Sequence, residues 1–398
     1  MIQNKYIRLL SVFFMLILLN MGLTSCKEDE PNDSPFTEEK FQTTILVYAV
    51  ATNTLSVNLE PDKNEMLLGA ENIDLSKNKI LVYQTTYKED PQLIELVKTD
   101  DGYVFETVSI YSKDISALDP SRISEVIESV IDRYPSNNYG LIFWSHSSGS
   151  QPFMDALQPE NAPAPASFGQ DLTTEDVTTK SINIDLLASL IPDDVFKFIW
   201  FDSCYMGNIE SIYEFRGKCK YYIGYATEVL DAGMPYDMVL PLITGKSPDP
   251  VKGAEAFFKY YEEYPYSSLR IATVAVVDMD EIERIADVCR DPYKNIGTVN
   301  YTNLMRYTRG STGPFYELGD YVRSMTPEEN LEEFNQKWEE ALNACILYKA
   351  ATPRDFSGNI IYPERYSGLS CHLYNPEDDS LKESYYKSLA WYKSVVGE

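Results

Sequence analysis

Six runs of apolar and β-branched residues constrain the fold of this chain more than any other feature. They cover residues 44–50, 79–84, 139–145, 195–201, 220–226 and 269–277. Runs that are apolar almost throughout are typical of strands buried on both faces of a parallel sheet. Helical patterns separate most of these runs, and alternation of strand and helix predicts parallel strands joined by right-handed crossovers. We therefore expect an α/β fold with a mostly parallel sheet of about six core strands.

The clearest helical pattern begins at Pro120, with Asp119 as its N-cap, and carries an apolar stripe along one face. A second helix is expected around residues 62–72. Residues 92–110 are expected to form a β-hairpin around an Asp-Asp-Gly turn. We interpret the hairpin as an addition to the sheet that carries no site.

The chain has 398 residues, which is more than one minimal core requires. After residue 278 the pattern becomes mostly helical and adds one half-buried strand. The helices are predicted at residues 278–290, from Gly313-Pro314 onward, at 328–343 and at 380–394, and the strand at 369–373. We therefore predict a main α/β domain over residues 43–292 and a C-terminal, mostly helical subdomain over residues 293–398.

The N-terminus has the three parts of an export signal. Lys5 and Arg8 form a charged region, residues 9–19 form a short apolar core, and the sequence Leu-Thr-Ser-Cys ending at Cys26 offers a small-residue cleavage site. The apolar core is too short to span a membrane as a helix. We therefore predict a signal peptide over residues 1–25.

The sequence around Cys26 resembles the lipobox of bacterial lipoproteins, in which this cysteine becomes the acylated first residue. The acidic segment from Lys27 to Glu30 resembles the tag that sends some Bacteroidota lipoproteins to the cell surface. Residues 26–42 would then be a lipid-anchored flexible tether. The resemblance implies an outer membrane lipoprotein that is exposed at the cell surface. An ordinary secretory signal followed by a generic acidic linker is the alternative.

The charge balance argues against nucleic acid as a partner. The chain has 34 basic and 61 acidic residues and a formal net charge of -27, so no basic stripe is available to displace phosphate counterions. The acidic surface would attract basic peptides, or it serves solubility alone.

Four further cysteines give no metal site. Cys219, Cys289, Cys345 and Cys371 are widely spaced and form no C-x-x-C pair, so no zinc site can be identified. Each lies in an apolar or periodic segment, where a buried free thiol is expected, although an exported protein could oxidise them.

Two of the apolar runs end beside reactive side chains. One leads into Asp202-Ser203-Cys204, and another leads into His146, one of the two histidines in the chain. Open α/β sheets bind ligands at the carboxyl ends of their strands, so we expect this thiol and this imidazole to meet there. An imidazole stabilises a thiolate and later protonates the leaving amine, so the pair predicts a cysteine–histidine hydrolase. A buried structural cysteine is the alternative that these residues alone leave open.

Two neighbouring features complete the site prediction. Gly207 allows a sharp turn into a helix, and a helix N-terminus near Cys204 would favour its thiolate. The second histidine, His372, lies in an alternating strand pattern without an adjoining carboxylate or thiol motif. We interpret His372 as a structural or surface residue.

Four segments, taken in order, resemble the clostripain family of cysteine peptidases. They are residues 143–149 (FWSHSSG), 167–171 (SFGQD), 201–207 (FDSCYMG) and 232–237 (AGMPYD). The pattern Asp-x-Cys-x-Met-Gly is the most specific part. The likeness covers residues 43–245 well and the order of segments to about residue 375 more loosely. It implies a caspase-like fold, a three-layer α/β/α sandwich, which agrees with the parallel sheet expected above.

Carried over by residue, the resemblance implies a catalytic dyad of His146 and Cys204. Asp202 matches the acid that shapes a pocket for a basic side chain, and it would prefer Arg to Lys by two-point geometry. Capping the following helix is the alternative role for Asp202. Asp231 lies where the family adds a second pocket acid. No resident cofactor is implied; calcium dependence is known among relatives, but no site is assigned here.

Ser147 departs from the family pattern, which has Gly directly after the catalytic His. The backbone N–H groups of Ser147 and Cys204 would form the oxyanion hole. Ser resists a positive φ, so its N–H would be misaimed if the position requires one. The leading prediction is an extracytoplasmic, lipid-anchored endopeptidase that cleaves proteins or peptides after Arg or Lys. The alternative is a surface binding lipoprotein with weakened or absent catalysis.

Overall fold

The computed structural model describes residues 40–150, 167–172, 180–296, 303–307, 315–374 and 381–397. Lys40–Glu398 forms one compact unit. The predicted signal peptide, Cys26, nearly all of the predicted tether and Gly313-Pro314 lie outside the described residues. Within the described ranges, no helix is both long enough and apolar enough to cross a membrane. The predicted domain boundary after residue 292 stays a prediction.

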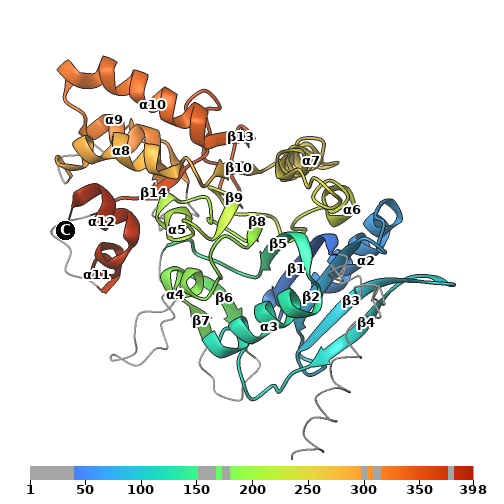
Figure 1. The fold of residues 1–398 in the computed structure, drawn as a ribbon. Coiled ribbons are helices and arrows are strands. Elements are labelled where there is room, and N and C mark those ends of the chain that lie inside the picture. The colour runs from blue at the N-terminus through green and yellow to red at the C-terminus, as the bar shows by residue number, and fades with distance from the viewer. Residues whose placement is uncertain are drawn as a thin grey trace, which may run out of the picture. The chain divides into compact units, whose positions relative to one another are not determined.

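A nine-stranded sheet forms the centre of the fold (Figure 1). Its order is β13-β10-β9-β8-β5-β1-β2-β3-β4. The strands are β1 Phe41–Val50, β2 Asn78–Thr85, β3 Gln92–Thr99, β4 Gly102–Ile110, β5 Ser136–Trp144, β8 Phe196–Asp202, β9 Cys219–Gly224, β10 Thr273–Asp278 and β13 Ile346–Ala351. All six predicted runs form strands, and β1, β2, β5, β8 and β9 run parallel. The predicted α/β fold is therefore confirmed.

Antiparallel strands extend the sheet at both ends. The predicted hairpin forms β3 and β4, which continue the sheet beyond β2. At the other end β10 pairs antiparallel with β9, and β13 pairs antiparallel with β10. Two reversals return β13 to the direction of β9, so both strands end at the same edge. No apolar run marks β13, because it is a half-buried edge strand.

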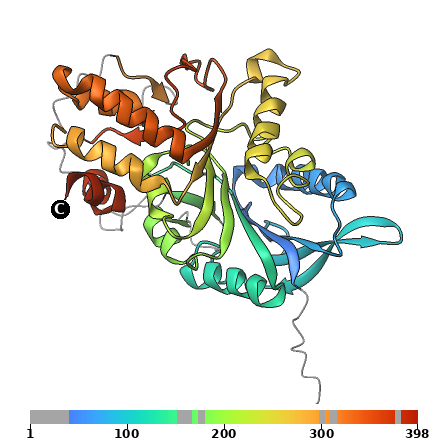
Figure 2. The same cartoon turned by 45° about the horizontal axis from the view of Figure 1, so that its top comes forward.

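Helices cover both faces of the sheet. They are α2 Leu59–Gly69, α3 Pro120–Arg133, α4 Ile184–Ser189, α5 Ile209–Glu214, α6 Tyr236–Val239, α7 Pro250–Glu262, α8 Ile282–Tyr293, α9 Leu318–Met325, α10 Leu331–Cys345, α11 Leu381–Ser388 and α12 Ala390–Val396. One hydrophobic core joins the sheet to α3, α4, α5 and α8, and the other joins it to α2, α6 and α7 (Figures 1 and 2). This is the expected three-layer arrangement.

Successive side chains of β8 point into opposite cores. Ile199 and Phe201 belong to the core with α3, α4 and α5, whereas Phe198 and Trp200 belong to the core with α2, α6 and α7. Side chains two residues apart on a strand share a face. The alternation therefore directs Asp202, the last residue of β8, toward α6.

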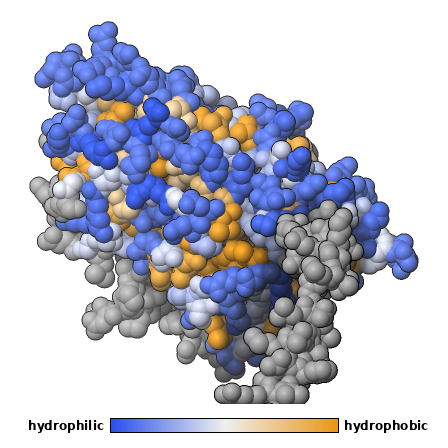
Figure 3. Space-filling model, in the orientation of Figure 1, coloured by the Kyte–Doolittle hydropathy of each residue, from blue (hydrophilic) through white to orange (hydrophobic). Residues whose placement is uncertain are grey.

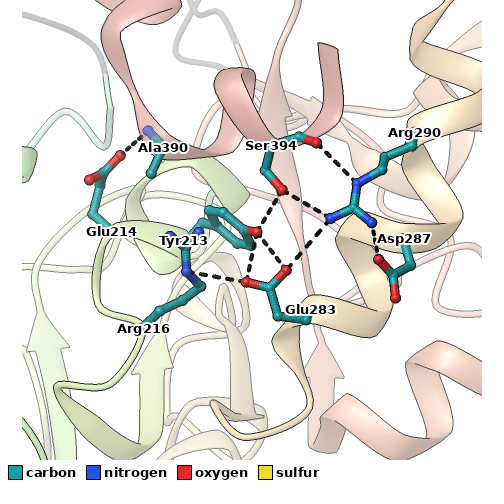
Figure 4. A network of polar contacts seen from close by, with 8 residues as sticks. All are labelled: Tyr213, Glu214, Arg216, Glu283, Asp287, Arg290, Ala390 and Ser394. Carbon is teal, nitrogen blue, oxygen red and sulfur yellow. Dashed lines mark hydrogen bonds and ion pairs between the residues drawn. The ribbon is translucent and has the colours of Figure 1, made fainter. Parts of the chain in front are cut away.

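A polar network holds the C-terminal helices against α5, the helix that follows Cys204 (Figure 4). The Tyr213 hydroxyl of α5 donates to Glu283 of α8 at 2.8 Å or to Ser394 Oγ of α12 at 2.7 Å. Arg290 of α8 donates to the Ser394 carbonyl at 3.1 Å.

The single helix predicted over residues 380–394 is replaced by two helices, α11 and α12, because Leu389 between them has an extended backbone.

The surface reflects the polar composition of the chain. Hydrophilic residues cover most of the face drawn in Figure 3, and apolar residues gather toward its middle. The acidic residues at the start of α10 follow this pattern, since the Glu333 side chain is 71% exposed. A solvated role explains this acidic cluster without a bound partner.

Candidate active site

The loops that carry His146 and Cys204 leave the same edge of the sheet. Strands β5 and β8 are parallel neighbours, and Trp144 at the end of β5 pairs with Asp202 at the end of β8. His146 follows two residues after Trp144, and Cys204 follows two residues after Asp202. The expected meeting of the two segments is therefore observed.

A short pairing with β6 (Phe168–Asp171) fixes the loop that carries His146. Gly169 N–H donates to the His146 carbonyl at 2.9 Å, and Ser148 N–H donates to the Ser167 carbonyl at 3.0 Å. These bonds flank the bridge between Ser147 and Phe168. They leave the Ser147 N–H outside the ladder, as a donor to a substrate oxygen would require.

The concern about the Ser147 backbone is wrong. Among the described residues other than glycine, only Asp194 and Tyr205 have a positive φ, so Ser147 has an ordinary one. The positive φ of this loop, +63°, falls on Gly149, where a Cβ atom would lie 2.7 Å from the Tyr205 carbonyl oxygen. The Ser147 hydroxyl instead donates to the Cys204 carbonyl and ties the two loops together.

The chain turns sharply directly after Cys204. Tyr205 has a φ of 60°, and its N–H donates to the Thr227 carbonyl at 3.0 Å. The N–H of Gly207 donates to the Tyr225 carbonyl at 2.7 Å. The expected helix begins at Ile209, with Asn208 as its cap. A short loop therefore separates Cys204 from the helix N-terminus, and the effect of this helix on the Cys204 thiolate stays a prediction.

His146 and Cys204 line one pocket with a volume of about 290 Å³. Its lining residues are Leu55, Trp144, Ser145, His146, Asp202, Ser203, Cys204, Glu228, Val229, Leu230, Asp231, Gly233 and Phe356. His146 Nε2 lies 2.7 Å from the Thr54 hydroxyl, and the Cys204 thiol lies 3.8 Å from the Val229 carbonyl. The pocket thus brings a thiol and an imidazole together.

Cys204 differs from the other described cysteines in its exposure. Cys219, Cys289, Cys345 and Cys371 are free and buried, as expected, whereas Cys204 is partly exposed. Burial raises the pKa of the thiols of all four buried cysteines. Such thiols stay protonated and poorly nucleophilic, so Cys204 is the reactive candidate among them.

Asp202 lines the pocket and is only 5% exposed. Its Oδ2 accepts hydrogen bonds from Met234 N–H at 3.1 Å and from the Tyr236 hydroxyl at 3.0 Å. Its Oδ1 is buried and has no hydrogen-bond partner among the described residues. Burial raises the pKa of Asp202 to about 6. Because Asn208 caps α5, the capping role for Asp202 is wrong.

A second buried acid supports the pocket wall. Asp62 of α2 accepts a hydrogen bond from the Trp144 indole N–H at 2.7 Å. Burial and the nearby Asp202 raise the pKa of Asp62 to about 9. Of these two acids, Asp62 has its pKa raised further, so it binds a proton more readily than Asp202 does.

Asp231 lies at the rim of the same pocket. Its side chain is exposed, and its backbone carbonyl accepts a hydrogen bond from Asn58 Nδ2 at 2.8 Å. The predicted dyad and the two predicted pocket acids therefore all line one pocket: His146, Cys204, Asp202 and Asp231. Ser147 lies in the adjoining loop.

Sequence reasoning missed two contacts of the site and left the role of one histidine open between two alternatives. Thr54 and Phe356 come from distant parts of the chain, and no motif marks either of them. His372 is buried, and its Nε2 lies 2.8 Å from Glu383 Oε1, so it is structural and not a surface residue.

Among the described residues, no cluster of three or more His, Cys, Asp or Glu side chains could hold a metal ion.

Comparisons with known proteins agree on one relationship. The model of the clostripain family matches residues 47–395. The fold is similar to a secreted cysteine protease from Bacteroides thetaiotaomicron solved with an irreversible peptide inhibitor, at 25% identity and a TM-score of 0.76, over 89% of this chain and 98% of that chain. It is also similar to an inactive zymogen protease from Parabacteroides distasonis, at 27% identity and a TM-score of 0.75, over 90% and 99% of the two chains. No curated protein matches. Since the family model spans most of its length, this chain belongs to the clostripain family of cysteine peptidases.

Proposed function

We propose that this peptidase cleaves peptide bonds after basic residues, with Arg preferred to Lys, through a dyad of Cys204 and His146. The observation that carries the proposal is the buried Asp202 carboxylate, which lines the pocket and whose Oδ1 has no hydrogen-bond partner among the described residues. A buried charge without a partner is unfavourable, and a bound cation would remove this cost.

The chemistry follows from the groups around the pocket. The Cys204 thiolate attacks the carbonyl carbon of the substrate, and His146 stabilises this thiolate and then protonates the leaving amine. The N–H groups of Ser147 and Cys204 donate to the oxyanion that forms. These steps need no metal or cofactor, and we propose that activity persists when calcium is chelated.

The expected preference for Arg follows from geometry. The Asp202 carboxylate has one engaged and one unpartnered oxygen, and a guanidinium offers several donors in a planar fork. A Lys ammonium offers one compact charge. The exposed Asp231 at the rim adds a second negative charge, whose effect solvent screens.

Substitutions of the dyad test the activity. Cys204→Ala and His146→Ala should each abolish cleavage of Arg and Lys reporter peptides without lowering the thermal unfolding midpoint. The double variant should lose little more than either single variant, because the two residues act as one unit. Full activity in either single variant would contradict the dyad.

We also propose that Cys26 is acylated and holds the domain at the cell surface, on the strength of the signal sequence. The relative from B. thetaiotaomicron is described as secreted, which supports export. Cys26→Ser should release soluble protein, and neutral residues in place of residues 27–30 should keep the anchor but lose surface exposure. A wild-type protein that resists protease added to intact cells would contradict the outward placement.

The inactive binding module has lost its specific support. It depended on a misaimed Ser147 amide, and Ser147 has an ordinary φ. No other observation in the described residues favours it over the peptidase.

A further inference from the structure

The segment of residues 352–362, which follows β13 and forms a hairpin with one bridge between Arg354 and Ile360, presents one apolar side chain, Phe356, at the catalytic pocket. Phe356 is one of the pocket residues, although 50% of its surface is exposed. Ile360 and Tyr362 of the same hairpin are 48% and 42% exposed. Binding is favoured when a ligand covers exposed apolar surface, because that surface is removed from water. This hairpin is therefore suited to contact the substrate.

Hydrogen bonds to Asp355 hold the tip of the hairpin in one shape. The Asp355 carboxylate is buried and accepts from the Asn359 backbone N–H at 2.8 Å and from Asn359 Nδ2 at 2.6 Å. The Asp355 N–H donates to the Asn359 carbonyl at 3.1 Å. Gly358 between them has a φ of +83°, which favours glycine. Phe356 is therefore presented by an ordered turn.

The base of the hairpin is anchored on both sides. Thr352 N–H donates to the Ala272 carbonyl at 2.9 Å, and Ala272 N–H donates to the Thr352 hydroxyl at 2.9 Å. On the returning side, the N–H of the buried Ile361 donates to the Pro353 carbonyl at 3.0 Å. These bonds hold the base of the hairpin against the residues that precede β10.

The strand order decides which part of a substrate the hairpin meets. His146 follows β5, Cys204 follows β8, and Phe356 follows β13 at the end of the sheet. Phe356 therefore lies on the opposite side of Cys204 from His146. His146 protonates the leaving amine, so the C-terminal part of the substrate departs on the His146 side. The N-terminal part must extend over residues 228–233 toward Phe356.

We propose that Phe356 forms a subsite for an apolar side chain on one of the two residues that precede the basic residue. The proposal rests on the proposed function and adds the substrate class: apolar residues followed by Arg or Lys. The pocket already joins this surface to Asp202, since Phe356 and Asp202 line it together.

Paired reporter peptides test this subsite. Each pair ends in Arg at the cleaved bond and has leucine or serine at one of the two preceding positions. In the wild type, leucine should raise kcat/KM about tenfold or more at one of these positions, as apolar contacts in enzyme pockets do. In Phe356→Ala this ratio should fall to about threefold or less, and in Phe356→Leu it should recover in part.

Leu347→Ala is the matched control. Leu347 lies on β13, is 42% exposed and does not line the pocket, so its variant should keep the wild-type ratio. Thermal unfolding checks that every variant is folded, and the ratio within one protein is independent of its overall rate.

Three outcomes would overturn the proposal. Equal ratios in the wild type and Phe356→Ala would exclude Phe356 from the subsite. A leucine preference found only after the cleaved bond would show that the assigned direction is wrong. A wild type that cleaves no Arg or Lys reporter would overturn the proposed function first, and the subsite with it.

Discussion

Replacing Asp202 by Asn should remove the preference for basic substrates while keeping the shape of the pocket. The Asn carbonyl would accept the two hydrogen bonds that Met234 and Tyr236 now donate to Oδ2. The amide NH₂ would then stand where Oδ1 is unpartnered and would present donors to a guanidinium that also offers only donors. Losing a buried charge-assisted contact costs about 2 to 4 kcal/mol, which is about 30-fold to about 1,000-fold in kcat/KM.

The assay compares reporter peptides that end in Arg with peptides that end in citrulline, its neutral isostere. Asp202→Asn should lower kcat/KM for Arg strongly and for citrulline little. Asp231→Asn is the matched control, because this exposed rim carboxylate should change the Arg value by less than about threefold. An unchanged ratio of Arg to citrulline in Asp202→Asn would refute the reasoning.

The pH dependence gives the same test a second readout. Burial raises the pKa of Asp202 to about 6, so the carboxyl gains a proton as the pH falls below this value. The wild-type preference for Arg over citrulline should therefore be full well above pH 6 and decline as the pH falls through about 6. In Asp202→Asn the preference should be small and independent of pH in this range.

Three further substitutions test other parts of the site and fold. Ser147→Gly should not raise kcat, and it should lower kcat if the bond from the Ser147 hydroxyl to the Cys204 carbonyl positions the two loops. A clear gain in kcat would indicate that Ser147 aims its backbone N–H poorly at the oxyanion. Thr54→Val should lower kcat about fivefold with little change in KM, because His146 loses one hydrogen bond of about 1 kcal/mol. An unchanged kcat and an unchanged pH profile would show that the contact between Thr54 and His146 has no role in catalysis. Burial raises the pKa of Glu210 to about 8, above its ordinary value of 4.5, so its contribution to stability is full below pH 4.5 and is lost as the pH rises through 8. Glu210→Gln should therefore show a smaller fall in unfolding midpoint between pH 5 and pH 9 than the wild type, and identical curves would contradict this account.

The sequence allowed the sheet to be predicted because its core strands are almost continuously apolar. Residues 139–145 and 195–201 are marked by that property, and their ends carry His146 and Cys204. Parallel strands that flank one crossover are commonly neighbours, as β5 and β8 are here, so the fold class made the meeting of the thiol and the imidazole the expected arrangement.

Other parts of the site depend on contacts that leave no local pattern. Thr54 reaches His146 across 92 residues of sequence, and Phe356 joins the pocket through a half-buried edge strand that no apolar run marks. The backbone at Ser147 could not be judged from residue type, because the positive φ falls two residues later on Gly149. Burial of His372 beside Glu383 likewise depends on the packing of α11.

The central claim is that Cys204 is the nucleophile of a pocket that binds a basic side chain. The most direct measurement is intact-mass analysis after exposure to a thiol-directed peptide analogue that carries Arg at the reacting position, followed by mapping of the modified cysteine. The account predicts one adduct on Cys204, none in Cys204→Ala, and much slower labelling in Asp202→Asn. An accessible, reduced Cys204 that stays unmodified, or an Arg analogue that reacts no faster than its citrulline counterpart, would contradict it.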